Sequence, residues 1–293
     1  MKTAWSIDWL SVTFKNGVSD LELRKALSFG FPLKTWQQTQ PRFGYSAAFT
    51  HPLGLLVMAN YGRPEMGVHL ALSGRALKSL AEGGQSATAM LDWVIKQDGK
   101  ITRLDLAIDA FEVEINPLKL AACPRVALDP GTARKWSSVE SANGGKTAYI
   151  GSRKSERFLR VYDKAAEQGR QGELWTRFEI ELKGQSARVA GQAMSLLSDA
   201  ERPHYIKGLI KALFNPDDET FRQVINADAV LLETTKDTDD NTVDWLINSV
   251  AKTIAKTMVR RADVDLWNEI CVAVHSNLVA LGALDLAAEQ TGF

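Results

Sequence analysis

The sequence is poor in cysteine. Its 293 residues include only Cys123 and Cys271, which form no CxxC pair. A disulfide framework and a thiolate zinc site are therefore not expected, and a reduced, cytoplasmic setting is favoured. The N-terminus has no apolar run of signal-peptide length, and no stretch of about 18 uncharged apolar residues occurs. We expect neither secretion nor a membrane span.

The sequence also lacks net charge and a phosphate loop. Lys and Arg together number 35, as do Asp and Glu, so the total does not point to a nucleic-acid partner. The distribution is uneven, because Arg134 to Arg170 contains nine basic and four acidic residues, whereas Asp217 to Asp244 contains nine acidic and two basic ones. A basic middle segment suits phosphate, and the acidic stretch repels it. Without a GxxxxGK[ST] motif, no ATP motor is predicted.

Hydrophobic residues make up 45% of the chain, enough for a sizeable core. Period-two spacing predicts strands over 6–14, 43–49, 54–60, 67–73, 101–111, 134–139, 147–152, 157–164 and 175–183. Helical spacing predicts helices over 19–28, 74–97 with a break at the Gly83–Gly84 pair, 116–122 and, after Gly184, over 185–198, 203–214, 218–225, 242–260 and 263–288. We therefore expect an α+β fold: a central antiparallel-rich β-sheet with flanking helices over 1–200, then a helical C-terminal region over 201–293. The polar stretch 233–241 is the best linker candidate.

The segment ITRLDLAIDAF, residues 101–111, carries acidic residues on one face. Every second side chain of a strand points the same way, so Arg103, Asp105 and Asp109 share a face while the apolar residues between them face the core. Two carboxylates so placed can bind a hard cation such as Mg²⁺ or Mn²⁺. The alternative is a solvated polar face on which Arg103 pairs with Asp105.

The segment WTRFEIELK, residues 175–183, repeats the pattern. Arg177, Glu179, Glu181 and Lys183 share one face, and the apolar residues between them share the other. If this strand and 101–111 are neighbours in one sheet, their carboxylates can form a shared metal site.

A tyrosine stands in the basic segment 157–164. Arg160, Tyr162 and Lys164 share a face of this predicted strand. A phenol ionises near pH 10 and is a poor nucleophile, but flanking cations would favour the phenolate and attract a phosphate. The alternative is a half-buried strand tyrosine beside surface basic residues.

A small basic turn precedes that tyrosine. It joins the predicted strands 147–152 and 157–164 and contains Arg153, Lys154 and Arg157. Backbone amides and cations at this turn could contact DNA phosphates. The alternative is a solvated hairpin tip.

Four segments taken in this order resemble the replication initiation factor family: GVHLALSGRAL, ITRLDLAID, TAYIGSRKSERFLRVYDKAAE and WTRFEIELK. That family contains rolling-circle replication initiators of plasmids and filamentous phages, and it is related to some conjugative relaxases. The resemblance spans Asp8 to Lys183. The combination is fairly specific, whereas any one segment alone is a weak signal.

The resemblance implies a site. The tyrosine of the family's R-x-Y-[DN]-K pattern attacks DNA and corresponds to Tyr162. The acidic residues of the R-x-D and R-x-E strands supply the metal site and correspond to Asp105 and Glu179. Asp109, Glu181 and Asp8 are further candidates for the metal, which would be Mg²⁺ or Mn²⁺.

The resemblance also implies an activity. The chain would nick the origin strand, presented single-stranded or in a hairpin, and would form a 5′-phosphotyrosyl link and a free 3′-OH primer. A host helicase and a polymerase would work beside it, and a homodimer is one assembly that the helical tail would allow. The C-terminal region shows no family pattern. Its apolar residues at helical spacing over 242–288, together with the acidic stretch 217–244, predict a packing or partner module and not the main DNA-contacting surface.

One departure bears on the metal. Many initiators bind metal through a His-hydrophobic-His strand, and here His69-Leu70-Ala71 offers only one histidine, so a carboxylate site is required. Three alternatives stay open: a conjugative relaxase at a transfer origin, a non-catalytic DNA-binding regulator, and a tyrosine recombinase, which needs an Arg/His cluster and no metal.

Overall fold

The protein is described by a computed structural model over residues 2–15, 18–124, 135–142, 144–170, 172–232, 254, 257–258 and 265–280. The chain divides into two compact units, Met1–Thr234 and Thr235–Phe293. In the second unit, α11 (Asp265–Ala280) lies within the helix predicted over 263–288. The predicted linker and most of the predicted helix 242–260 lie outside the described residues. No helix in the described ranges is long and apolar enough to cross a membrane.

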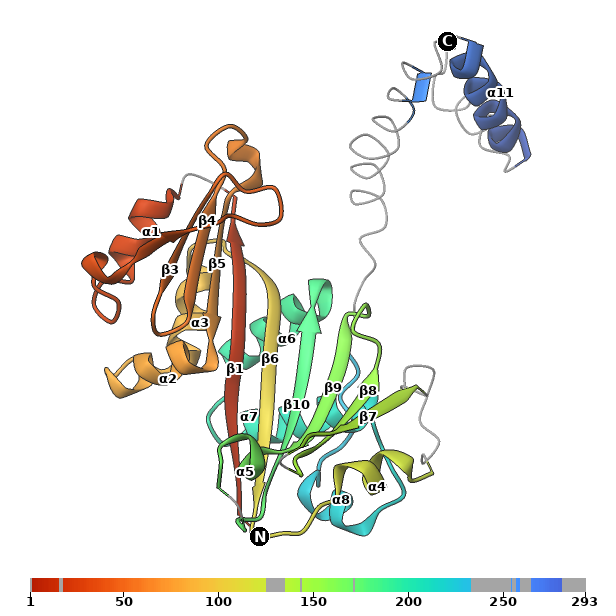
Figure 1. The fold of residues 1–293 in the computed structure, drawn as a ribbon. Coiled ribbons are helices and arrows are strands. Elements are labelled where there is room, and N and C mark those ends of the chain that lie inside the picture. The colour runs from red at the N-terminus through yellow and green to blue at the C-terminus, as the bar shows by residue number, and fades with distance from the viewer. Residues whose placement is uncertain are drawn as a thin grey trace. The chain divides into compact units, whose positions relative to one another are not determined.

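A single ten-stranded antiparallel sheet organises the first unit (Figure 1). Its strand order is β2-β3-β4-β5-β1-β6-β10-β9-β8-β7. The strands are β1 (Lys2–Phe14), β2 (Gln37–Thr39), β3 (Ala47–His51), β4 (Leu55–Ala59), β5 (Val68–Ser73), β6 (Lys100–Phe111), β7 (Trp136–Glu140), β8 (Lys146–Gly151), β9 (Arg157–Asp163) and β10 (Trp175–Lys183). The predicted α+β fold with an antiparallel sheet is confirmed, and the strands 101–111 and 175–183 are neighbours, as a shared site requires.

Helices cover one face of this sheet and leave the middle of the other face open (Figure 1). The helices are α1 (Asp20–Ala26), α2 (Gly74–Glu82), α3 (Ala87–Lys96), α4 (Pro117–Ala122), α5 (Lys164–Glu167), α6 (Gly184–Leu196), α7 (Arg202–Leu213) and α8 (Glu219–Val224), with 3-10 turns η1 (Leu33–Thr35) and η2 (Pro64–Met66). The predicted break at Gly83–Gly84 divides the helical stretch 74–97 into α2 and α3. Gly84 has a φ of +85°, which only glycine adopts cheaply, and Ser86 caps the second helix.

The core lies between the sheet and the helices. On β6, Leu104, Leu106 and Ile108 are fully buried, and on β10 the matching residues Phe178 and Ile180 are fully buried. Because side chains alternate along a strand, burying these residues directs the polar residues between them toward the open face. The sequence alternation is thus realised as two faces, one apolar and one charged.

The first compact unit extends past the predicted domain boundary at residue 200. Helices α7 and α8 belong to it, and the Phe221 ring lies 5.9 Å from the Phe178 ring and 5.5 Å from the Phe214 ring, centroid to centroid. Because these rings complete the core beneath β10, the division falls at Thr234.

Phe221→Ala tests this assignment. The ring is 1% exposed, so its removal should lower the free energy of unfolding by about 3–5 kcal/mol. Urea unfolding of the full chain, followed by tryptophan fluorescence, measures the change. Leu196→Ala, at a residue 87% exposed, should change it by less than about 0.5 kcal/mol. Equal effects of the two changes would show that α8 is not part of the core.

Candidate active site

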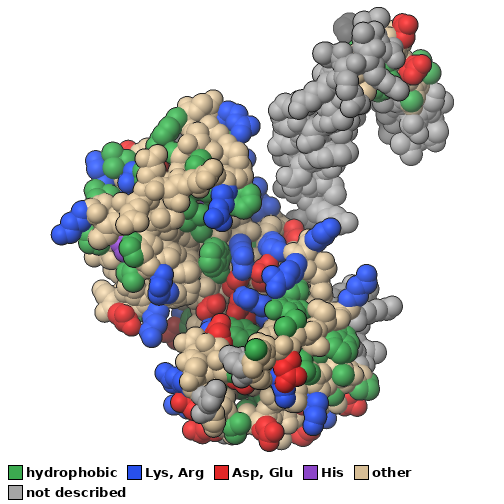
Figure 2. All heavy atoms as spheres, viewed as in Figure 1, with side chains coloured by type: hydrophobic (Ala, Val, Ile, Leu, Met, Phe, Trp, Pro, Cys, Tyr) green, Lys and Arg blue, Asp and Glu red, His purple; other side chains and the backbone are tan. Residues whose placement is uncertain are grey.

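Acidic and basic side chains gather on the open face of the central strands (Figure 2). Asp105 and Asp109 of β6 and Glu179 and Glu181 of β10 are all buried, at 8% exposed or less. Glu181 stands opposite Asp105 in the register of the two strands. The four carboxylates predicted from the two alternating strands therefore lie together on one face.

Arg103 and Lys183 neutralise one end of this face. The guanidinium of Arg103 donates to both oxygens of Asp105, at 2.8 and 2.6 Å, and contacts Glu181 at 2.9 Å. Lys183 Nζ lies 2.6 Å from the other oxygen of Glu181. The ion pair that sequence reasoning offered as the alternative for Arg103 is therefore present.

Arg177 neutralises the next part. Its Nε and Nη2 donate to the two oxygens of Asp109, each at 2.8 Å, and its Nη1 donates to Asp8 at 2.8 Å. The indole of Trp175 also donates to Asp109, at 2.7 Å. Alternation places Arg177 on this face, but its role as the link between two acidic residues 101 positions apart has no signal in the sequence.

Asp8 reaches this face through an irregularity in β1. Ile7 and Trp9 pair with consecutive residues of β6, so Asp8 is an extra residue in the register, as in a β-bulge. A Cβ on Gly74 would lie 2.7 Å from Asp8 Oδ1. Glycine at the start of α2 therefore leaves the space that the Asp8 carboxylate occupies.

Tyr162 lies at the other end of the face, on β9. Its ring is 8% exposed, and its hydroxyl donates to Glu179 Oε2 at 3.0 Å. Arg160 Nη2 contacts the other oxygen, Glu179 Oε1. A cleft of about 420 Å³ opens here and is lined by Ser141, Gly145, Thr147, Tyr149, Arg160, Tyr162, Asp163 and Glu167.

The protonation of Tyr162 differs from the expectation drawn from its neighbours in sequence. Burial, followed by the Glu179 carboxylate, raises the pKa of the phenol well above its ordinary value. Arg160, expected to favour the phenolate, is instead engaged by Glu179. Tyr162 is therefore a neutral hydrogen-bond donor at rest, and it must lose its proton to an acceptor before or during any attack.

Lys164 does not continue the strand, contrary to the predicted strand 157–164. Asp163 caps α5, accepting from the Ala166 amide at 2.9 Å, and Lys164 is the first residue of that helix. Lys164 pairs with Glu167, and its Nζ lies 5.5 Å from the centroid of the Tyr162 ring. Lys164 therefore lies beside Tyr162 because it begins α5, and not because the two residues share a face of one strand.

Two carboxylates on this face hold protons more tightly than usual. Burial raises the pKa of Asp105 to about 6, against the lowering effect of Arg103 and with Glu179 and Glu181 adding to the rise. Burial likewise raises the pKa of Glu179, against Arg160. Burying several carboxylates together has a free-energy cost that the arginines offset only in part.

This cost predicts a pH dependence for Asp105→Asn. Because the folded pKa of Asp105 lies above its unfolded value, Asp105 lowers the free energy of unfolding by about 3 kcal/mol above about pH 6, and this penalty disappears as the pH falls toward about 4. Relative to wild type, the always neutral Asn variant should therefore be about 3 kcal/mol more stable at about pH 7 than at about pH 4. Urea unfolding at the two pH values measures the difference. An unchanged difference would contradict the raised pKa.

The predicted DNA-contacting residues lie on the hairpin between β8 and β9. Arg153 and Lys154 are exposed, and Arg157 is partly exposed. The Arg153 guanidinium lies 5.1 Å from the ring centroid of Tyr149 and 5.3 Å from that of Phe158. The hairpin thus presents cations at the start of β9, whereas Tyr162 lies near its end. Arg157 and Tyr162 are about 17 Å apart along the strand, at about 3.3 Å per residue.

His69 lies elsewhere. Its ring contacts Thr13, with Nδ1 3.1 Å from the hydroxyl oxygen, and its centroid lies 6.2 Å from that of Tyr45. Burial lowers the pKa of this imidazole. These contacts, at the far end of β1, are those of a structural histidine.

The carboxylates of this face are the candidate ligands for a metal ion. Within the described ranges, no three His, Cys, Asp or Glu side chains are arranged to hold a metal. Each predicted ligand instead binds a side-chain cation: Asp8, Asp105, Asp109, Glu179 and Glu181. The chemistry of the donors still fits, because carboxylate oxygens are what Mg²⁺ and Mn²⁺ prefer.

Three comparisons relate the chain to known proteins. Residues 99–271 match the model of a family described as replication initiation factor. The curated protein named "Putative DNA relaxase NicK" from Bacillus subtilis (strain 168) is 27% identical over an alignment of 212 residues, and the match covers 66% of this chain and 59% of that protein. The chain thus spans less than two thirds of the length of this relative.

A solved structure has a similar fold. It is titled "Structure of Rolling Circle Replication Initiator Protein from Geobacillus stearothermophilus", and it superposes with a TM-score of 0.58 at 22% sequence identity. The match covers 78% of this chain and 93% of that chain.

Proposed function

The chain belongs to the replication initiation factor family, and on this premise we propose that it nicks one strand of DNA with Tyr162 and stays linked to the cut 5′ end. One observation carries the proposal: the Tyr162 hydroxyl donates to Glu179 beside Arg160 at the wall of an open cleft. A nucleophile, a proton acceptor and a cation are thereby within reach of one phosphate.

The proposed step is an in-line displacement at a phosphodiester. The phenolic oxygen of Tyr162 forms a bond to phosphorus as the bond to the 3′ oxygen breaks. The phenolic proton passes to Glu179 Oε2, its hydrogen-bond acceptor, and the departing 3′ oxygen takes up a proton to become a 3′-OH. Arg160 and Lys164 lie beside the tyrosine and stabilise charge on the phosphate oxygens. A later 3′-OH reverses the attack and closes a circle.

Mg²⁺ or Mn²⁺ is the cofactor that the donors suit. Asp105 and Glu179 would hold it, with Asp8, Asp109 and Glu181 beside them. When bound, such an ion polarises the scissile phosphate. The arginines that now contact these carboxylates would then be free to contact phosphate oxygens.

The proposed substrate is the origin strand of a replicon, single-stranded or in a hairpin, with Arg153, Lys154 and Arg157 contacting its backbone. A host helicase and a polymerase would follow the nick, and a homodimer is a further proposal for its assembly. A second candidate function, nicking at a transfer origin, is favoured by the likeness to a protein named as a DNA relaxase. The same chemistry would serve both.

Two other interpretations predict different results. A DNA-binding regulator would form no covalent link to DNA. A tyrosine recombinase would form the link without a metal.

The test uses supercoiled DNA from the protein's own replicon, incubated with the full chain in Mn²⁺ or in EDTA. We expect a nick with the protein bound to its 5′ end in Mn²⁺, and loss of that product in EDTA. Unlinked, intact DNA in both conditions would contradict the proposed function. A linked nick in EDTA would contradict the metal alone.

A further inference from the structure

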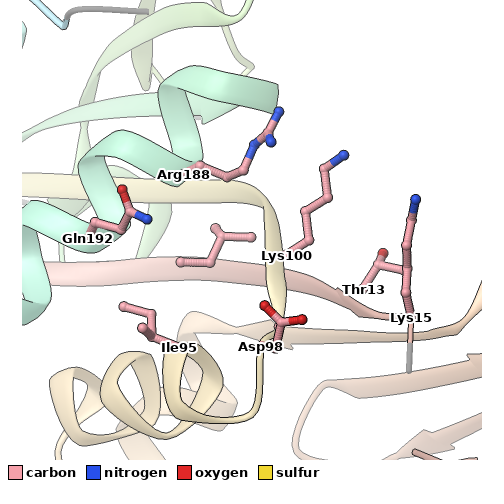
Figure 3. A pocket seen from close by; sticks show the side chains of 9 residues that line it. Thr13, Lys15, Ile95, Asp98, Lys100, Arg188 and Gln192 are labelled. Carbon is pink, nitrogen blue, oxygen red and sulfur yellow. The ribbon is translucent and has the colours of Figure 1, made fainter. Parts of the chain in front are cut away.

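A second cleft lies at one end of the sheet, away from Tyr162. It has a volume of about 390 Å³ and is lined by Thr13, Lys15, Ile95, Asp98, Gly99, Lys100, Ile101, Arg188 and Gln192. The end of β1, the start of β6, the turn after α3 and the helix α6 therefore all contribute to it. Figure 3 shows the cationic ends of Lys15, Lys100 and Arg188 reaching toward the same open space, with Asp98 below them.

Arg188 differs from the arginines beside Tyr162. Arg103, Arg160 and Arg177 are all paired with buried carboxylates. Arg188 forms no ion pair with a carboxylate of the described residues, and its buried Nε has no hydrogen-bond partner there, as is also true of Arg160 Nε. Its guanidinium end therefore faces the cleft without a carboxylate partner.

The balance of charge favours an anion. Three cations stand against one carboxylate, that of Asp98, so the local formal charge is positive. Lys15, Lys100 and Gln192 are exposed, so an incoming group can reach them. Ammonium and guanidinium donors converging from three elements suit phosphate oxygens.

We propose that this cleft binds a backbone phosphate of the DNA strand at a point outside the cleavage site. The proposal rests on the proposed function, because it takes DNA as the ligand. Lys15 directly follows the end of β1 and lies seven residues beyond Asp8, which is about 23 Å at about 3.3 Å per residue. A DNA strand cut at Tyr162 reaches this cleft only if it is long enough to cross the end of the sheet. Because the contacts are to phosphate, binding in the cleft should not depend on DNA sequence.

The experiment compares two lengths of single-stranded DNA, about 30 and about 8 nucleotides, across a range of salt concentrations. The cleft variant is the full chain with Lys15→Gln, Lys100→Gln and Arg188→Gln together, and it is compared with wild type. We expect the affinity for the long strand to fall at least about tenfold, and the slope of log K against log salt to fall by about 0.7, as for one single-strand phosphate contact. Affinity for the short strand should not change.

The matched control removes the same charge elsewhere, through Lys34→Gln, Lys78→Gln and Lys119→Gln. These lysines are exposed on η1, α2 and α4, and their loss should leave both the long-strand affinity and the slope nearer to wild type. Lys15→Glu, at an exposed strand end, gives the same test if the triple variant does not fold. Equal losses in the cleft variant and the control would overturn the proposal.

Failure of the proposed function would look different. If wild type forms no covalent link but loses long-strand binding through the cleft variant, nicking is wrong and the phosphate cleft stands. If wild type links to DNA and the cleft variant binds the long strand as wild type does, the cleft is wrong and nicking stands.

Discussion

Tyr162→Phe should abolish the covalent link between protein and DNA while DNA binding persists. The exchange removes one oxygen and keeps a ring that is 8% exposed, so the packing of β9 does not change. The fold loses one hydrogen bond, that to Glu179, at a cost of about 1 kcal/mol in the free energy of unfolding. The reaction loses its nucleophile, and no neighbouring group restores the oxygen that must bond to phosphorus.

Tyr149→Phe is the matched control. Tyr149 lies on β8 and lines the same cleft, and its ring stacks on that of Phe158 at 5.9 Å. This variant should still form the link. Denaturing electrophoresis with a 5′-labelled or 3′-labelled strand shows whether protein is attached and to which end. A linked product from Tyr162→Phe, together with none from Tyr149→Phe, would assign the nucleophile to Tyr149 instead.

The faces of the site strands could be predicted from sequence because strand alternation is a local property. Side chains alternate between the two faces of a strand, and every second residue here is apolar. Asp105 and Glu179 therefore each lie on the face of their strand away from the apolar residues, whatever the rest of the chain does. Alternation could not predict that β6 and β10 are neighbours, because their pairing joins residues about 70 positions apart. A shared metal site could therefore be predicted only on the condition that the two strands pair. The resemblance to a known family made that condition reasonable, and the sheet order confirms it.

The electrostatics of the site could not be predicted in this way. Flanking Arg160 and Lys164 suggested a lowered pKa for Tyr162, but Glu179 from another strand engages Arg160 and the phenol is buried. Desolvation and a neighbouring carboxylate together outweigh cations that lie close only in sequence. Asp8 needed an irregular register in β1 to reach Arg177, and periodicity does not show such an irregularity.

Glu179→Gln should reduce the rate of nicking by about 10²- to 10⁴-fold, the range of a lost proton acceptor. The exchange keeps the shape of a side chain that is 1% exposed. It removes the charge that Arg160 contacts and weakens the acceptor for the Tyr162 proton. If Glu179 also helps to hold a metal, the variant should require more Mn²⁺ for half-maximal rate. Single-turnover nicking of a labelled strand over a range of Mn²⁺ concentrations measures both effects.

Glu181→Gln is the control that separates this role from a general loss of negative charge. Glu181 lies two residues further along the same face of β10, is also buried, and pairs with Arg103 and Lys183 instead of Tyr162. Its exchange should slow nicking far less than that of Glu179, because the Tyr162 hydroxyl keeps its acceptor. Strand affinity should persist in both variants, since neither exchange removes a cation that could contact phosphate. Equal losses of rate would mean that the summed charge of the face matters, and the specific pairing of Tyr162 with Glu179 would not explain the chemistry.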